Sequence, residues 1–212
     1  MGISSVYSIR IVIDMWMYVC VCACVDVDVQ ELGRILIYEA TSDWYSASTV
    51  TMPMRSPCGD VDGEFIDPSK PLRVIPILRA GLVLLENASD VLPCATTHHL
   101  GYVRDEESLQ PSLYLNKLPE RFEEDERVLL VDPMLATGGT MRAAVEECVS
   151  RGVNIRNLRC IVAVCAPPAL QNLSDAFPDL TIYAGGIDPE LDEKGYIVPG
   201  LGDAGDRSFG TL

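Results

Sequence analysis

Residues 128–140 read Val-Leu-Leu-Val-Asp-Pro-Met-Leu-Ala-Thr-Gly-Gly-Thr, and this stretch decides the fold. Four apolar residues end at Asp132, a short loop leads to Thr140, and a helical pattern of apolar residues follows. This order predicts a buried strand, a turn at its carboxyl end and the start of a helix. In an open α/β sheet, that is the place where ligands bind.

The residues of this turn indicate the kind of ligand. Gly138 and Gly139 let the backbone come close to a ligand, and the unpaired N–H groups at a helix start attract an anion. Thr137 and Thr140 add hydroxyl donors, whereas Asp132 would repel an anion and is expected to accept hydrogen bonds from sugar hydroxyls. The segment therefore predicts a phosphate beside a ribose. It is neither a Walker loop nor a G-x-G-x-x-G fingerprint, and a βα turn that merely carries a glycine-rich cap is the alternative interpretation.

Apolar runs alternate with apolar residues at helical spacing along the chain. Residues 49–67 mix β-forming residues with proline and glycine, which predicts a hairpin or two strands joined by a loop. Strands are expected at residues 73–78, 95–100, 128–131, 158–166 and 180–183, and helices at 30–39, 80–91, 141–149 and 168–177. Strands that alternate with helices predict an α/β fold on a doubly wound, mainly parallel sheet.

Composition restricts the organisation and the partners. The chain has 212 residues, of which 48% are hydrophobic, so residues 30–212 are expected to form a single domain. Its net charge of −15 argues against binding to nucleic acid or to an anionic membrane. Eight cysteines do not suggest a disulfide framework in a chain of this size, and Cys148, Cys160 and Cys165 are interpreted as buried thiols of a reducing compartment.

Residues 1–29 form an atypical apolar segment. Its longest run without charge, residues 15–25, is too short to span a bilayer. A signal peptide is one interpretation, although Asp14 and the aspartates after the run fit it poorly. A β-prone apolar segment is the other, since Cys20, Cys22 and Cys24 alternate and lack metal-binding spacing.

Two further clusters carry groups suited to ligand binding. Arg79 and Arg104 each follow an apolar strand of the expected sheet, so they could converge on one edge and bind phosphate oxygens; an arginine in a surface ion pair is the alternative. Residues 195–207 contain four glycines together with apolar residues and Pro199, which favours an ordered loop over a mobile tail. Main-chain groups of such a loop could match the donors and acceptors of a flat pyrimidine.

Residues 77–81, 102–107, 132–140 and 195–211 resemble the uracil phosphoribosyltransferase branch of the type I phosphoribosyltransferases in order and spacing. The resemblance covers about residues 31–211. It implies a type I phosphoribosyltransferase-like fold with a small accessory (hood) region and a flexible hairpin loop. It also implies transfer of the phosphoribosyl group of phosphoribosyl pyrophosphate to uracil in pyrimidine salvage, giving UMP and diphosphate, with Mg²⁺ bound with the substrate's diphosphate.

The resemblance also assigns roles to residues. It puts Arg79 and Arg104 on the diphosphate, Asp132 on the ribose hydroxyls and residues 136–140 around the 5′-phosphate. Uracil would be held by Ile197 and residues 202–204. The expected catalytic residues are Arg104, Asp132 and Asp203. The expected substrate-binding residues are Arg79, Arg104, Asp132, Pro133, Met134, Leu135, Ala136, Thr137, Gly138, Gly139, Thr140, Ile197, Gly202, Asp203 and Ala204.

Further expectations concern the loop, the partners and the location. Residues 105–126 are a candidate lid over the site, and residues 185–212 a base-binding segment. The resemblance implies a homo-oligomer such as a homodimer, a GTP effector, and a cytoplasmic location with the plastid as the alternative. The apolar residues 1–29 depart from the polar N-terminal arm that is usual in the family.

Two other functions stay open at this point. One is a non-catalytic phosphoribosyl-binding regulatory module, which the presence of Arg79, Arg104, Asp132 and Asp203 disfavours. The other is a phosphoribosyltransferase for a different base, which residues 195–207 disfavour. His98 and His99 fall in no family motif and are not expected to act in catalysis.

Overall fold

The computed structural model describes residues 9–11, 25–104 and 111–211. Their central feature is a nine-stranded sheet in the order β1-β11-β10-β8-β4-β6-β7, with β5 beside β4 and β9 beside β10. Its middle strands are β4 (Leu72–Leu78), β8 (Val128–Val131), β10 (Leu158–Cys165) and β11 (Thr181–Ile187). Its outer and short strands are β1 (Ile9–Ile11), β5 (Ala95–Thr97), β6 (Leu100–Arg104), β7 (Pro111–Asn116) and β9 (Met134–Leu135).

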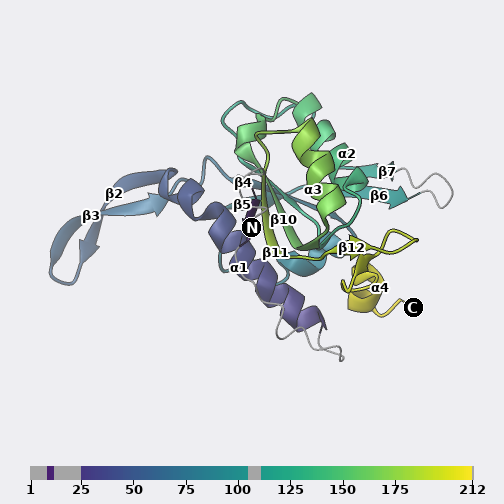
Figure 1. The fold of residues 1–212 in the computed structure, drawn as a ribbon. Coiled ribbons are helices and arrows are strands. Elements are labelled where there is room, and N and C mark those ends of the chain that lie inside the picture. The colour runs from purple at the N-terminus through teal and green to yellow at the C-terminus, as the bar shows by residue number, and fades with distance from the viewer. Residues whose placement is uncertain (1–8, 12–24, 105–110, 212) are drawn as a thin grey trace.

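Every strand pair of this sheet is parallel except β6 with β7, which are antiparallel. Helix α1 (Val25–Ser46) covers one face of the sheet, and α2 (Gly139–Ser150) and α3 (Pro167–Ala176) cover the other (Figure 1). Short 3₁₀ helices, η2 (Ala80–Leu85) and η3 (Ile155–Asn157), follow β4 and precede β10. The expected α/β fold on a mainly parallel sheet is confirmed.

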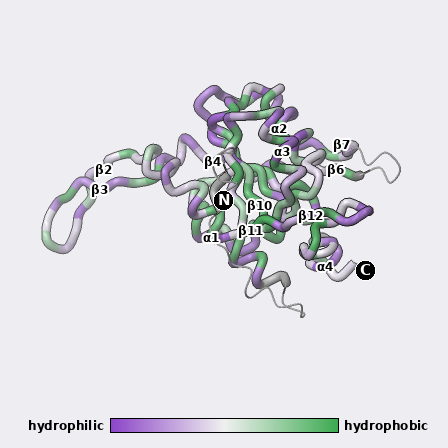
Figure 2. The backbone as a smooth tube through the Cα atoms, viewed as in Figure 1, coloured by the Kyte–Doolittle hydropathy of each residue, from purple (hydrophilic) through white to green (hydrophobic). Residues whose placement is uncertain are grey.

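The four residues of β8 show why this strand lies at the centre. All four side chains are fully buried; Val128 and Leu130 pack with α2 and α3, whereas Leu129 and Val131 pack with α1. A strand that is covered on both faces needs a continuous apolar run, and the sequence supplies one. Full burial of each such side chain stabilises the fold by roughly 1.5–3 kcal/mol. Figure 2 shows the same apolar centre between more polar helices.

Among the described residues, two hairpins of different length lie outside the central sheet. Strands β2 (Thr49–Ser56) and β3 (Gly59–Ile66) form a long hairpin that projects from the body of the molecule, as predicted for residues 49–67 (Figure 1). Strands β12 (Glu190–Leu191) and β13 (Ile197–Val198) form a short one beside α4 (Ala204–Phe209). Among the described residues, no helix has both the length and the apolar composition needed to cross a bilayer.

Several expected elements have different bounds in the structure. The helix expected at 30–39 is α1, which begins inside the segment assigned to residues 1–29. The helix expected at 80–91 is only the 3₁₀ helix η2, because Asn87, Ser89 and Asp90 favour turns through their side chains. The strand expected at 95–100 is divided between β5 and β6, which pair with opposite ends of β4.

The N-terminal segment and the candidate lid are only partly described. Of residues 1–24, only β1 is described; it pairs with β11, so the expected β-prone character applies there, and the other residues lie outside the described part. Residues 105–110 of the candidate lid also lie outside it. Residues 111–116 form β7, and the chain beyond it is anchored in the core by Leu118 and Phe122, both buried.

Candidate active site

A cavity of about 250 Å³ lies where β8 ends and α2 begins. Its walls bring together the Thr-Gly-Gly-Thr turn and the carboxyl-terminal glycine-rich segment, which are far apart in the sequence. The lining residues are Ala80, Asp132, Met134, Leu135, Ala136, Thr137, Gly138, Gly139, Thr140, Met141, Gly195, Tyr196, Ile197, Gly202, Asp203, Ala204 and Gly205. The two clusters therefore share one pocket.

The turn before α2 is shaped for an anion. Gly138 is the residue before the helix and has a φ of +83°, a left-handed conformation that other residues adopt at a cost. A Cβ at this position would lie 3.2 Å from the backbone of Ala169, so the turn packs closely on α3. Gly138 has no side chain that could cap the helix, and the first N–H groups of a helix have no partner within it. They and the helix dipole favour a bound phosphate.

Asp132 lines the cavity and directly follows β8. Its N–H donates to the carbonyl of Ile161 at 3.1 Å, which joins it to β10. Burial of its carboxyl raises the pKa to about 7, and the N–H of Met134, 3.4 Å from Oδ1, opposes this only weakly. This carboxylate is able to accept a further hydrogen bond, such as one from a ribose hydroxyl.

Arg79 follows β4 at the same edge of the sheet, and a cis peptide bond joins it to Leu78. Its Nη2 lies 2.8 Å from Oδ1 of Asp206, and its Nη1 donates to Oγ1 of Thr211 at 3.3 Å. The guanidinium also lies 6.0 Å from the centre of the Phe209 ring. Arg79 therefore borders the cavity next to Ala80 and is held there by α4 and the chain after it.

Arg104 is the last residue of β6, a parallel neighbour of β4 in which Leu100 and Gly101 pair with Ile77 and Leu78. The backbones that carry the two arginines thus end at the same edge of the sheet, as expected. The side chain of Arg104 lies outside the described residues.

The carboxyl-terminal segment forms the opposite wall. Ile197 is buried, with 3% of its surface exposed, and it lines the cavity from β13. Asp203 precedes α4 and its Oδ1 accepts a hydrogen bond from the N–H of Asp206 at 2.9 Å. Gly202, between them, has a φ of +69°. These residues present main-chain groups and one carboxylate to the cavity.

A family model described as uracil phosphoribosyltransferase matches residues 25–211. The chain belongs to the uracil phosphoribosyltransferase family. A uracil phosphoribosyltransferase of Nicotiana tabacum is 56% identical over 183 residues, which are 86% of this chain and 81% of that one. A chloroplastic uracil phosphoribosyltransferase of Arabidopsis thaliana is also 56% identical, over 86% of this chain and 61% of the relative. The solved structure of the AQ2163 protein from Aquifex aeolicus has a TM-score of 0.77 and 35% identity, over 88% of this chain and 86% of that one.

Membership of the uracil phosphoribosyltransferase family confirms the expected fold class and enzyme class. The chain is a phosphoribosyltransferase of pyrimidine salvage, and nothing favours the non-catalytic module. Most of the expected substrate-binding residues line the cavity. Three of them are not among its lining residues: Arg79 lies next to Ala80 at the border, the side chain of Arg104 lies outside the described residues, and Pro133 is buried. The carbonyl of Pro133 accepts hydrogen bonds from the N–H groups of Ala163 and Val164, so it joins the turn to β10.

Sequence reasoning missed some residues of this uracil phosphoribosyltransferase site. Ala80 and Met141 line the cavity without having been assigned to it, whereas Gly195, Tyr196 and Gly205 were expected only as members of the base-binding segment 185–212. Asp206 was quoted within the segment 195–207, but its contact with Arg79 joins residues 127 positions apart, and no local pattern indicates such a pair.

The described residues of this site offer few ligands for Mg²⁺. Among them, no group of three or more His, Cys, Asp or Glu side chains is arranged to hold a metal. The cavity does present two carboxylates, Asp132 and Asp203. Mg²⁺ usually binds through one or two carboxylates together with substrate phosphates and water. This donor set therefore fits an ion that binds together with a diphosphate.

Proposed function

We propose that the chain transfers the phosphoribosyl group of 5-phospho-α-D-ribose 1-diphosphate to uracil within the cavity between the start of α2 and the carboxyl-terminal segment. The supporting observation is that a phosphate-binding turn and a wall rich in main-chain groups line one space of about 250 Å³. A sugar phosphate on the turn would point its reactive carbon at a base held by the opposite wall.

Each part of the substrates has a proposed set of partners. The 5′-phosphate lies on the N–H groups of residues 137–140, with the hydroxyls of Thr137 and Thr140 beside it. The ribose hydroxyls donate to Asp132. Uracil lies against Ile197 and residues 202–204, whose main-chain groups match its N–H and C=O groups. A base with an amino group would leave a buried donor without a partner, which costs on the order of 1–3 kcal/mol.

The proposed reaction depends on positioning and electrostatics. The bond between C1′ and the diphosphate oxygen breaks, and the sugar carbon becomes cation-like. Uracil N1 then forms a bond to C1′, and the N1 proton is lost to water. The described lining residues include no histidine, cysteine or lysine, so the rate is attributed to alignment of the two substrates and to charge stabilisation. Arg79 and Arg104 would stabilise the negative charge that develops on the leaving diphosphate.

Two further elements complete this proposal. Asp132 and Asp203 would hold Mg²⁺ together with the diphosphate, and the ion would add positive charge beside the departing group. The candidate lid, residues 105–126, of which 111–116 form β7, is proposed to cover the site and exclude water from the activated sugar.

The projecting hairpin supports the proposal of a homodimer. Register in β2 and β3 places Met52, Met54, Val61 and Phe65 on one face, and each has between 38% and 49% of its surface exposed. The opposite face carries Asp60, Asp62 and Glu64. A two-stranded hairpin is only marginally stable by itself, so an apolar face of this kind is expected to pack on another surface. A second copy of the chain is the proposed partner.

The regulation and location are proposed on the family resemblance. GTP is the proposed effector, which the rate at subsaturating phosphoribosyl pyrophosphate with and without GTP would test. A cytoplasmic location is proposed, with the plastid as the alternative that the name of the Arabidopsis relative supports. Fluorescent fusions of the full chain would distinguish these two compartments.

One assay tests the central proposal. Radiolabelled uracil, phosphoribosyl pyrophosphate and Mg²⁺ are incubated with the protein, and UMP is separated and counted. Formation of UMP is the expected result. Product with a different base only would overturn the assignment of uracil, and ligand binding without turnover would favour the regulatory module.

A further inference from the structure

Asp188 is a buried carboxylate that has no role in the site described above. It directly follows β11, and only 1% of its surface is exposed. Its N–H donates to the carbonyl of Cys165 at 2.8 Å, which fixes it to the end of β10. Its Oδ2 accepts a hydrogen bond from the N–H of Gly200 at 2.8 Å. Carboxylates are rarely buried this deeply unless they have a partner, so this contact needs an explanation.

Gly200 connects Asp188 to the base-binding wall. It has a φ of +56°, and a Cβ at this position would lie 2.1 Å from the carbonyl oxygen of Ile197 and 2.8 Å from its carbonyl carbon. The backbone of Gly200 is therefore packed directly on the backbone of Ile197, whose side chain lines the cavity. A shift of Gly200 would carry Ile197 with it.

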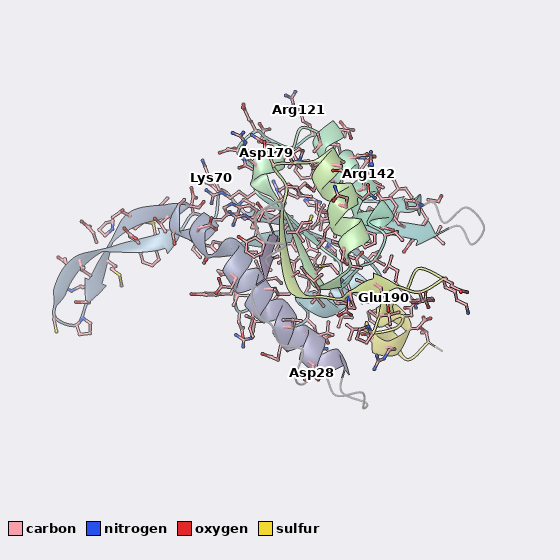
Figure 3. All side chains as sticks on the ribbon, in the orientation of Figure 1. Asp28, Lys70, Arg121, Arg142, Asp179 and Glu190 are labelled. Carbon is pink, nitrogen blue, oxygen red and sulfur yellow. The ribbon has the colours of Figure 1, made fainter. Side chains whose placement is uncertain are left out.

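A second cavity lies behind this wall. It has a volume of about 320 Å³ and is lined by α1, the ends of β10 and β11, and the segment 199–202, with Asp188 and Gly202 in its surface. Asp28, at the amino end of α1 in Figure 3, also lines it. Gly202 belongs to both cavities, so the segment 199–202 is a thin partition between them. The partition has room to move away from the base except where contacts hold it. The carboxylate of Asp188 holds Gly200, and Nη1 of Arg207 donates to the carbonyl of Leu201 at 2.7 Å.

We propose that Asp188 is a positioning residue that holds this partition through Gly200 and so sets the affinity and alignment of uracil. The inference rests on the proposed function, because it concerns the wall assigned to the base. In this proposal, Asp188 does not contact the substrate. Loss of its carboxylate frees the N–H of Gly200, and the partition can then relax into the space behind it.

The test compares Asp188→Ala and Asp188→Asn with the matched control Glu190→Ala. Glu190 lies on β12, two residues after Asp188, and its side chain is exposed (Figure 3). Its replacement removes the same charge but leaves the hydrogen bond between Asp188 and Gly200 in place. Asp188→Ala is expected to raise the KM for uracil at least tenfold, with the KM for phosphoribosyl pyrophosphate changed less than twofold. Asp188→Asn keeps a weaker, neutral acceptor and is expected to lie between, at about threefold. Glu190→Ala should keep both values within twofold of wild type.

The outcomes separate positioning from general stabilisation. An unchanged uracil KM in folded Asp188→Ala, or equal changes in both KM values, would overturn the inference. If Asp188→Ala does not fold, the same comparison of the KM for uracil with the KM for phosphoribosyl pyrophosphate is made with Asp188→Asn, and its result decides. Binding of radiolabelled UMP, measured by equilibrium dialysis with the same proteins, should weaken in the order wild type, Asp188→Asn, Asp188→Ala. This binding order needs no turnover, so failure of the inference is distinguished from failure of the proposed function.

Discussion

Arg79 and Asp206, 127 residues apart in the chain, form an ion pair of 2.8 Å that joins the turn after β4 to α4. Thr211 extends this contact, since its Oγ1 donates to Asp206 at 2.7 Å. These hydrogen bonds, from Thr211 first and Arg79 second, hold the pKa of Asp206 below its usual value. The guanidinium is thus fixed beside the cavity and remains half exposed to solvent. Such an arginine is oriented in advance for a second anion.

Replacement of Arg79 by Ala should lower kcat/KM for phosphoribosyl pyrophosphate by roughly tenfold to a hundredfold. The variant loses the charge-assisted hydrogen bonds that Arg79 is proposed to make to the diphosphate, which contribute about 1.5–3 kcal/mol each. The free energy of unfolding should change by less than about 1 kcal/mol, because an exposed ion pair contributes little. Steady-state kinetics and urea denaturation measure the two quantities.

Arg142→Ala is the control for this change. Arg142 lies on α2, where it pairs with Glu146 at 3.0 Å and with Asn172 at 3.0 Å, and Figure 3 shows it away from α4. The Arg142→Ala change removes an arginine that is also half exposed and ion-paired but does not line the cavity. An equal loss of kcat/KM in both variants would show that the effect comes from net charge rather than from a contact at the site.

The Thr-Gly-Gly-Thr turn allows a second comparison, between two adjacent glycines. Gly138→Ala should lower the free energy of unfolding by about 1–2 kcal/mol, because Gly138 has a left-handed φ and a Cβ would meet the backbone of Ala169 at 3.2 Å. Gly139→Ala should not lower it, since a Cβ there meets only Pro111 and Thr137 at 3.8 and 3.9 Å, and alanine favours the helix. Chemical denaturation of both variants tests this; equal values would mean that the conformation of Gly138 is not required.

The centre of the fold could be predicted because its signals are local. The apolar run of β8, the following turn and the helical spacing of α2 together specify a strand, a turn and a helix without reference to the rest of the chain. The length of helix α1 was underestimated at its amino end, because its first residues alternate valine with aspartate, a pattern typical of a strand. Its position on the sheet outweighs that local preference.

The site could be predicted only in part for a related reason. Gly138 and Asp132 lie in one continuous motif, whereas the hold of Asp188 on Gly200 depends on a hydrogen bond between separate loops. An acidic residue after an apolar strand is visible in the sequence at Asp188, but its burial is not. Contacts of this kind depend on how the β12–β13 hairpin folds back, which periodicity does not indicate.

Asp132 should make the stability of the enzyme depend on pH. Burial raises its pKa to about 7 in the folded state, whereas the ordinary value is 3.8. The folded protein binds this proton more tightly, so the stabilising effect is complete below about pH 4 and is lost as the pH rises through 7. Asp132→Asn should therefore become more stable relative to wild type between pH 4 and 7, with no further change above. Thermal unfolding of both proteins across this range measures the difference.

Asp67→Asn gives a control of opposite sign. Hydrogen bonds from Ser69 lower the pKa of Asp67, so its contribution to stability is present above the ordinary value and is lost as the pH falls. The Asn variant should therefore lose stability relative to wild type as the pH rises to the ordinary value of 3.8, and the difference should stay constant between pH 4 and 7. A difference that rises for both variants would contradict the assignment of the Asp132 effect to burial.

The apolar face of the β2–β3 hairpin predicts how the proposed homodimer can be dissociated. Met54 and Val61 are direct partners across the hairpin, and the side chain of Met54 lies over Gly63 beside Phe65. Met54→Lys places a charge in the middle of this face, and a buried unpaired charge is costly, so association should weaken by at least tenfold. Thr51→Lys adds the same charge on the opposite face, next to Glu64, and should leave association unchanged. Sedimentation equilibrium at micromolar protein should give twice the 23.2 kDa chain mass for wild type and Thr51→Lys, and a falling average mass for Met54→Lys on dilution. If Met54→Lys keeps the wild-type mass on dilution, the dimer uses another surface.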